Sequence, residues 1–225
     1  MSSGPTGYSI YFLSITVLFV VTLLISNTVA VKIVGFGPFA ESGATILFPV
    51  VYIFGDVLTE VYGFRASRIV VWSGFFALML MSLAYTIVQY LPPASFWVDQ
   101  GAYDAILGAA PRIAIASMCA YLFGEFTNAY ILSRMKVRTE GARLWQRTIG
   151  STLVGQGVDT VIFNCIAFAF VFSWYELATV IVTGYVLKVV YEILATPLTY
   201  RVIAYLKKVE GVDVYDRGIS YNPFV

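Results

Sequence analysis

The chain has 225 residues, of which 59% are hydrophobic and 12% charged, with a formal net charge of +1 and a mean hydropathy of +0.81. This composition leaves too few polar side chains to cover a soluble globule, so the chain is expected to be an integral membrane protein. The absence of histidine excludes a Ser-His-Asp triad and a His-ligated metal, and both cysteines fall in apolar runs. We therefore expect no metal, no cofactor and no enzymatic activity, and the charge implies no nucleic-acid partner.

Six apolar segments have the length of roughly 20 residues that a membrane-spanning helix requires. They are residues 8–27, 44–62, 69–90, 112–133, 148–172 and 177–206. The first is too long for a signal peptide and has no basic region before it, so it is expected to be a retained span. These segments predict an all-α fold of six transmembrane helices in one domain over residues 1–206, followed by an irregular cytoplasmic tail over residues 207–225.

Basic residues gather in alternate connections between the predicted spans. They are Arg65 and Arg68 after the second span, Arg134, Lys136, Arg138, Arg143 and Arg147 after the fourth, and Lys207 and Lys208 after the sixth. The positive-inside rule places these connections in the cytoplasm, so both chain termini are expected there. The other connections then face outward, including the stretch from Leu91 to Asp104 with its interfacial Trp97.

Four of the predicted spans carry polar residues one helical turn apart, which places each pair on one face of its helix. The pairs are Asp56 with Glu60, Glu125 with Asn128, Gln156 with Asp159, and Lys188 with Glu192, while Asn27 and Lys32 lie near the outer end of the first span. Ionisable side chains within a bilayer are costly and usually line a solute or ion pathway. We therefore expect these faces to meet around a shared polar cavity.

The acids of this set outnumber its bases, because Lys32 and Lys188 are the chief cations in the membrane zone. Burial disfavours an unpaired carboxylate, so such groups would suit a proton, a cation or a ligand rich in N–H groups. Three alternatives stand beside this interpretation. Lys188 and Glu192 could form an ion pair within one helix, Glu60 could lie at the cytoplasmic interface, and Asn128 and Gln156 could join neighbouring helices by hydrogen bonds.

Aromatic residues flank the acids, among them Tyr52 in the second span and Phe163 in the fifth. A carboxylate that accepts two parallel N–H bonds beside a ring that can stack is the chemistry that recognises a guanine-like heterocycle. An amide such as Asn128 or Gln156 could address the carbonyl edge of such a ligand.

Dividing the six spans into two groups of three places an aspartate in the middle helix of each, Asp56 and Asp159, which allows a 3+3 pseudo-repeat. The similarity between the two halves is otherwise weak. The expected partners are the lipid bilayer and a small heterocyclic ligand, and small-residue faces leave room for a homodimer.

Several blocks of the sequence, in their order, resemble the queuosine precursor transporter family. They are Ser26 and Asn27 with Lys32, FPVVYIFGDVLTEVYGFRASR, GEFTN, LWQRTIGSTLVGQGVD, and Lys188 ahead of Pro197. The resemblance spans nearly the whole chain, and the ordered set is specific although each block alone is weak. It implies a six-helix importer in the bacterial inner membrane that takes up 7-deazaguanine precursors of the tRNA nucleoside queuosine, in cyano or aminomethyl form.

The family's polar signature carries over to Asn27, Lys32, Asp56, Glu60, Glu125, Asn128, Gln156, Asp159 and Lys188, without assigning their roles. Our hypothesis is that Glu125 and Asp159 hold the aminopyrimidinone face of the substrate while Phe163 stacks on its ring. The other substrate-binding candidates are Asn128, Gln156, Asn27 and Tyr52, and the coupling or gating candidates are Asp56, Lys188, Glu60 and Lys32.

The chain contains no P-loop and no soluble domain that could bind ATP, which favours secondary transport linked to protons. The main alternative is the substrate-binding subunit of an energy-coupling-factor transporter for a vitamin or nucleobase, which would need a separate ATPase module. An intramembrane enzyme would have to rely on carboxylates alone, and a small cation channel would need rings of acids formed by oligomerisation. Both of these fit the sequence less well.

Overall fold

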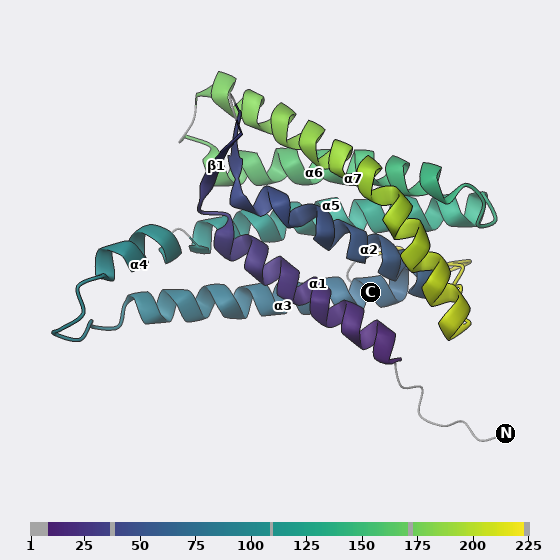
Figure 1. Cartoon of the computed structure of the whole chain (residues 1–225), viewed down its shortest axis with the longest axis horizontal. Coiled ribbons are helices and arrows are strands. Elements are labelled where there is room, and N and C mark those ends of the chain that lie inside the picture. Colours follow the sequence, from purple (N-terminus) through teal and green to yellow (C-terminus); the bar gives the residue numbers. More distant parts are fainter. Residues whose placement is uncertain (1–8, 37–38, 109, 171–172, 223–225) are drawn as a thin grey trace.

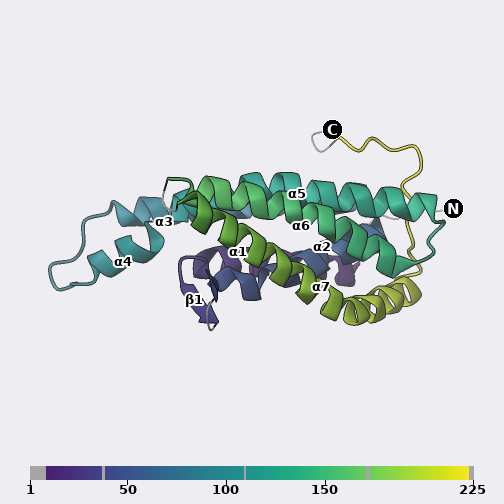
Figure 2. The ribbon, with the colours of Figure 1, turned by 90° about the horizontal axis from the view of Figure 1, so that it is seen from above.

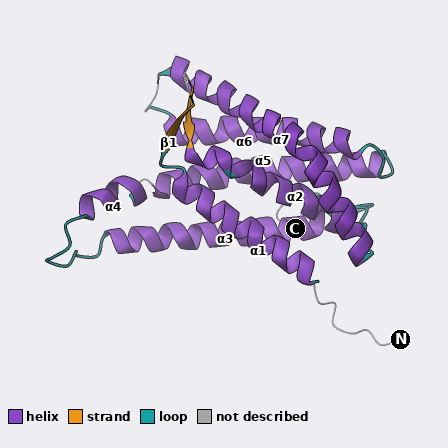
Figure 3. Ribbon diagram, viewed as in Figure 1, coloured by secondary structure: helices purple, strands orange, loops and turns teal. Residues whose placement is uncertain are grey.

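The computed structural model describes residues 9–36, 39–108, 110–170 and 173–222. Within these residues it is a bundle of helices with one two-stranded hairpin (Figure 3). The long helices are α1 (Ile10–Val29), α3 (Phe64–Gln89), α5 (Ala110–Arg138), α6 (Leu144–Phe168) and α7 (Trp174–Glu210), and the shorter α2 (Phe48–Tyr62) lies among them. In the described part of the chain, five helices are long and apolar enough to cross a membrane. The prediction of a multi-pass helical membrane protein is confirmed.

Each of the six predicted spans coincides with a helix, although the boundaries move. Tyr8 and Phe172, the predicted ends of the first and fifth spans, lie outside the described residues. The second span is α2, which has 15 residues and follows a short 3-10 turn, η1 (Gly43–Ile46). At a rise of about 1.5 Å per residue, α2 is too short to cross the roughly 30 Å hydrocarbon core of a bilayer by itself. How the six helices sit in the membrane, and any 3+3 repeat among them, stays a prediction.

Two elements lie in connections between the predicted spans, for which we predicted no secondary structure. Strands β1 (Ile33–Phe36) and β2 (Phe39–Ser42) pair antiparallel and link α1 to η1 and α2. Helix α4 (Gln100–Leu107) lies between α3 and α5, within the predicted outer loop. Both elements are too short to produce a membrane-length apolar run, which is the signal on which the prediction of helices relied.

The helices run up and down, so their connections gather at two ends of the molecule (Figure 1). The hairpin end holds β1, β2, α4 and the start of α7. The basic end holds the start of α1, the junction of α2 with α3 at Gly63, the turn over residues 139–143 and the end of α7. The three predicted groups of Lys and Arg therefore lie near one end, as their alternation along the chain required. Which membrane face this end meets stays a prediction.

Helices α5 and α6 lie side by side (Figure 2), and two glycines set their closest approach. A Cβ atom at Gly124 would lie 2.6 Å from the Cβ of Asp159, and one at Gly155 would lie 2.7 Å from the Cβ of Asn128. No real side chain fits at such distances, so only glycine allows the two backbones to come this close. The contact places the polar faces of α5 and α6 next to each other.

The segment after α7 is irregular but packs against the basic end. Helix α7 continues to Glu210, into the predicted tail, and ends at Gly211, whose φ of 63° is left-handed. The buried Asp216 then accepts a 2.9 Å hydrogen bond from the backbone N–H of Phe64, the first residue of α3, and another from the hydroxyl of Ser133 on α5. The tail thus covers this end of the bundle.

Candidate functional site

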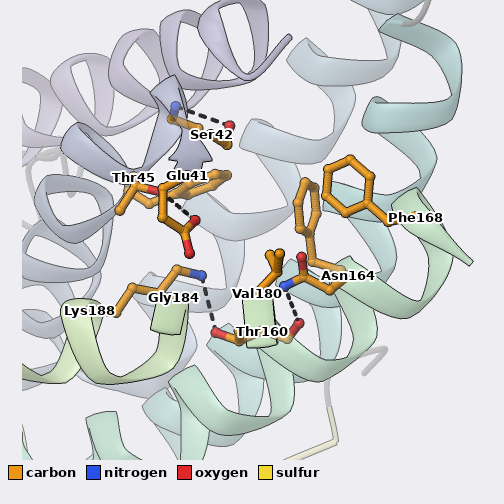
Figure 4. Close-up of a pocket in the computed structure, with 12 residues that line it drawn as sticks. Glu41, Ser42, Thr45, Thr160, Asn164, Phe168, Val180, Gly184 and Lys188 are labelled. Atoms are coloured by element: carbon orange, nitrogen blue, oxygen red, sulfur yellow. Dashed lines mark hydrogen bonds between the residues drawn. The ribbon is translucent and has the colours of Figure 1, made fainter. Parts of the chain in front are cut away.

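A pocket with a volume of about 110 Å³ lies beneath the hairpin, between β2, the start of α2, α6 and α7 (Figure 4). Its charged and polar lining includes Glu41, Thr45, Thr160, Asn164 and Lys188, and its aromatic lining is Phe48, Phe163 and Phe168. The pocket combines apolar rings with hydrogen-bond donors and acceptors, which is the usual make-up of a small-molecule site.

The three phenylalanines form an apolar wall of the pocket. Phe163 lies edge-on to both of the others, with its ring centroid 6.5 Å from that of Phe48 and 6.0 Å from that of Phe168. Phe48 is the first residue of α2 and is followed by Pro49, which the first turn of a helix tolerates because no N–H is needed there. Such rings offer faces for a planar heterocycle. The stacking role of Phe163 stays a prediction.

Lys188 forms a polar side of the pocket together with partners on the neighbouring helix. Its ammonium group donates hydrogen bonds to Asp159 (2.8 Å) and Thr160 (3.3 Å) on α6. The alternative of an ion pair with Glu192 within α7 is therefore wrong. Glu192 is buried, and neither of its carboxylate oxygens has a hydrogen-bond partner among the described residues. Helical spacing could not show this, because the partner of Lys188 comes from another helix.

Deeper in the bundle, side chains of α2, α5, α6 and α7 form what we call the central polar layer. Its members are Tyr52, Asp56, Glu125, Asn128, Gln156 and Glu192, all of them buried. Asn128 donates a 2.7 Å hydrogen bond to Asp56. Both oxygens of Glu125 and both polar side-chain atoms of Gln156 have no partner within the described part of the chain. A buried polar atom without a partner costs about 1–3 kcal/mol, so this layer retains hydrogen-bonding capacity for a ligand, water or a proton.

The central polar layer lies next to the ion pair that borders the pocket. Tyr52 lies within electrostatic reach of both Asp159 and Glu125, and Asp159 holds the Lys188 ammonium that faces the pocket. Gly55 on α2 makes room for the carboxyl group of Glu125, which a Cβ atom at this position would overlap.

Glu60 is fully buried near the basic end, which contradicts an exposed position at the cytoplasmic surface, while its depth in the membrane stays a prediction. Arg147 donates to both of its carboxylate oxygens, and Lys207 and Lys136 lie 2.8 Å and 3.7 Å from one of them. Asp213 of the tail joins the two lysines at 2.6 Å and 2.9 Å. The cations of α5 and α6 reach Glu60 because both helices extend beyond the predicted spans. We call these five residues the Glu60 cluster.

Two acids outside the spanning helices have shifted pKa values. Burial raises the pKa of Glu41 above its ordinary value, against the opposing charge of Lys188. Burial acts in the same direction on Asp213, but the hydrogen bonds and charges of Lys136 and Lys207 outweigh it and lower the pKa of Asp213 below its ordinary value. Glu41 is therefore a carboxyl group short of donors, whereas Asp213 is well supplied with them.

The predicted site residues fall into separate groups. Phe163 and Lys188 line the pocket, with Asp159 bound to Lys188. Tyr52, Asp56, Glu125, Asn128 and Gln156 lie in the central polar layer, and Glu60 lies in its own cluster.

Asn27 is buried on α1, where it donates a 2.9 Å hydrogen bond to the carbonyl of Leu23, and Lys32 is exposed in the turn before β1. Neither Asn27 nor Lys32 lines the pocket. The roles assigned to all of these residues stay predictions.

Sequence reasoning missed Glu41, Thr160 and Asn164 as pocket residues. Thr160 and Asn164 follow Gln156 at successive steps of four residues, so a polar stripe along the fifth span was a usable signal. Glu41 gave no such signal, because it lies between two predicted spans and reaches the pocket only through the unpredicted hairpin.

Comparisons with known proteins place this chain among transporters. A family model described as "Putative vitamin uptake transporter" matches residues 42–202. The "Probable queuosine precursor transporter" of Bacillus subtilis (strain 168) is 28% identical over 176 residues, which cover 78% of this chain and 77% of the relative. The "Queuosine precursor transporter" of Escherichia coli (strain K12) is 27% identical over 178 residues, which cover 76% of this chain and 77% of that relative. No solved structure matches the chain.

Proposed function

Because the chain belongs to the vitamin uptake transporter family, we propose that it imports 7-deazaguanine precursors of queuosine across the bacterial inner membrane. Family membership and the names of both relatives confirm the prediction of a transporter rather than an enzyme. The same names, which specify queuosine precursors, support the substrate class. The observation that carries the proposal is the pocket beneath the hairpin, where aromatic rings face an acid and a base.

In this proposal the planar substrate lies against Phe163 and Phe48, which cover it as apolar walls. Lys188 retains one N–H after its bonds to Asp159 and Thr160, and this N–H is available to the carbonyl oxygen of the pyrimidinone ring. The cyano and aminomethyl precursors share this ring system, so both are proposed substrates. When the substrate moves inward and loses its hydrogen bonds to the pocket, the unpartnered side chains of the central polar layer would form new hydrogen bonds with it.

The proposal places the hairpin end in the periplasm and the basic end in the cytoplasm, following the positive-inside rule. In this orientation the pocket lies toward the side of entry, and the Glu60 cluster closes the side of exit. Release of the substrate would require this cluster to separate. The tail would move with it, because Asp213 binds two of the cations.

We also propose that protons drive the cycle through the carboxylates of the central polar layer. Both oxygens of Glu125 and of Glu192 are buried without a hydrogen-bond partner among the described residues, so a bound proton would relieve their charge. Uptake should then collapse when an uncoupler dissipates the proton gradient and should persist when sodium is removed. The opposite pattern would reject proton coupling.

The function is tested by measuring queuosine in tRNA from a bacterial host that neither makes nor imports the precursor. The host receives low concentrations of each free deazaguanine, with or without this gene. Restoration by the single chain would support an autonomous importer. Restoration only after an ATPase module is supplied would favour the energy-coupling-factor alternative, and failure of both would reject the substrate class.

The site is tested in the same host with Glu125→Gln and Asp159→Asn. The matched control is Glu140→Gln, because Glu140 is exposed in the turn between α5 and α6. We expect both site variants to lose uptake when it is divided by the amount of protein in the membrane, and the control to transport normally. If both site variants transport at the wild-type level, the substrate site lies elsewhere.

A further inference from the structure

Glu41 extends from the hairpin into the pocket. Among the described residues that line the pocket, it is the one acid. Its side chain is nearly buried, with a residue exposure of 6%, and Figure 4 shows its carboxylate directed toward the amine of Lys188. One carboxylate oxygen accepts a long 3.4 Å hydrogen bond from Thr45, and the other has no partner within the described residues. A buried acceptor that faces a cavity can accept hydrogen bonds from a ligand with N–H groups.

Lys188 does not satisfy this carboxylate. Its short hydrogen bonds go to Asp159 and Thr160 on α6, and its charge acts on Glu41 through space. An ammonium group has three N–H donors, so one remains after these two bonds. Glu41 and Lys188 therefore present an acceptor and a donor next to each other in the same cavity.

The other acids of the site are less suited to bind what the pocket holds. Asp159 is engaged by Lys188, and Glu125 is not among the pocket-lining residues. Gly184 on α7 leaves the space that Glu41 uses, since a Cβ atom there would lie 3.2 Å from the Glu41 carboxylate oxygen. The family match begins at Ser42, so Glu41 lies just outside the matched range.

We infer that Glu41 recognises the aminopyrimidinone edge of the substrate, accepting the ring N–H with one oxygen and the exocyclic 2-amino group with the other. Lys188 donates to the adjacent carbonyl oxygen. The inference rests on the proposed function and moves to Glu41 the role that we first expected of Glu125 and Asp159. A guanine-like edge presents one acceptor and two donors in a row, which an ammonium beside a carboxylate complements. An adenine-like ring has a lone pair in place of the ring N–H and would be repelled by the carboxylate.

The experiment measures equilibrium binding by calorimetry to the full chain in lipid nanodiscs. The two ligands are 7-cyano-7-deazaguanine and its analogue without the 2-amino group, and the proteins are wild type, Glu41→Gln and Glu140→Gln. Wild type and Glu140→Gln should bind the analogue about tenfold or more weakly, because a hydrogen bond to a charged group is lost. Glu41→Gln should bind the parent ligand about 10- to 100-fold more weakly than wild type and should discriminate little between the two ligands.

The outcomes separate the inference from the proposed function. If wild type binds neither ligand, the proposed function fails. If Glu41→Gln weakens both ligands by the same factor, Glu41 does not contact the 2-amino group and the inference is overturned. Should Glu41→Gln fail to reach the membrane, wild type alone decides, since equal affinity for the two ligands would also overturn the inference.

Discussion

Lys188 on α7 and Asp159 on α6 form a 2.8 Å ion pair, and both residues are buried. A buried charge is stable only with its partner, because water no longer compensates it. The pair therefore joins α6 to α7 and holds the charged group of Lys188 at the wall of the pocket.

Breaking this pair on one side should destabilise the protein. Lys188→Met leaves a buried carboxylate and Asp159→Asn leaves a buried ammonium, so each should lower the free energy of unfolding by about 3–5 kcal/mol. The double variant removes both charges and should lose clearly less than the sum of the two. Unfolding of the four proteins in mixed micelles forms a double-mutant cycle, in which additive losses would show that the two residues are not coupled.

The close approach of α5 and α6 predicts that two glycines tolerate no methyl group. Gly124→Ala and Gly155→Ala would place a Cβ atom within 2.6 Å or 2.7 Å of a neighbouring Cβ atom, so we expect each to lower the free energy of unfolding by about 1–3 kcal/mol. Gly157→Ala is the control on the same helix, because its Cβ atom would lie 3.6 Å from the ring of Tyr185, an ordinary contact. Thermal unfolding in detergent compares the variants. Equal melting temperatures for all three variants would contradict the prediction.

The Glu60 cluster predicts a change in access from the basic end. Glu60→Gln removes the carboxylate that holds three cations together, so their repulsion should favour separation of the cluster. A cysteine introduced at the buried Ser151, in a chain whose Cys119 and Cys165 are replaced by alanine, reports this opening. We expect an impermeant thiol reagent, applied at the basic end, to label it several-fold faster with Glu60→Gln than with Glu140→Gln. Equal labelling rates would show that the cluster is not a gate.

Docking of the tail should depend on pH through Asp213. Its pKa is lowered in the folded protein because the hydrogen bonds and charges of Lys136 and Lys207 outweigh burial. The group therefore stabilises docking fully above its unfolded pKa of about 4, and the contribution disappears as the pH falls through the lower folded value. Hydrogen exchange of residues 212–222, corrected for intrinsic rates, should be constant from about pH 7 to pH 5 and should rise below about pH 4.

The control for this pH dependence separates Asp213 from the other acids. Asp213→Asn should show the faster exchange of the tail already at neutral pH, because the tail loses the carboxylate that binds Lys136 and Lys207. Asp99→Asn changes an exposed acid at the hairpin end and should leave the profile as in wild type. A profile for Asp213→Asn that matches wild type would contradict the assignment.

The helices could be predicted from the sequence because each leaves a long apolar run, and even the 15-residue α2 merges with the apolar residues before it. The hairpin and α4 leave no such signal, because each strand has four residues and α4 has eight. Small-residue faces could be recognised in the sequence, but the contact between Gly124 and Gly155 could not, because pairing depends on which helices become neighbours.

The site shows the same division. Helical spacing correctly placed polar residues on common faces of single helices, as with Glu125 and Asn128 in the central polar layer. It could not identify partners across helices, so the link of Lys188 to Asp159 and that of Glu60 to Arg147 were missed. Glu41 was missed for a different reason, because only the hairpin brings it to the pocket.

The hydrogen bond from Phe64 to Asp216 joins two points of the chain that are 152 residues apart. A ribosome makes the chain from its N-terminus, so α3 is synthesised long before the carboxylate that caps its first N–H. In each newly made molecule the first N–H of α3 therefore stays uncapped until translation is nearly complete, while the helices are already in the bilayer. A chain that stops short of Asp216 would retain all of its helices and still lack the group that completes that end.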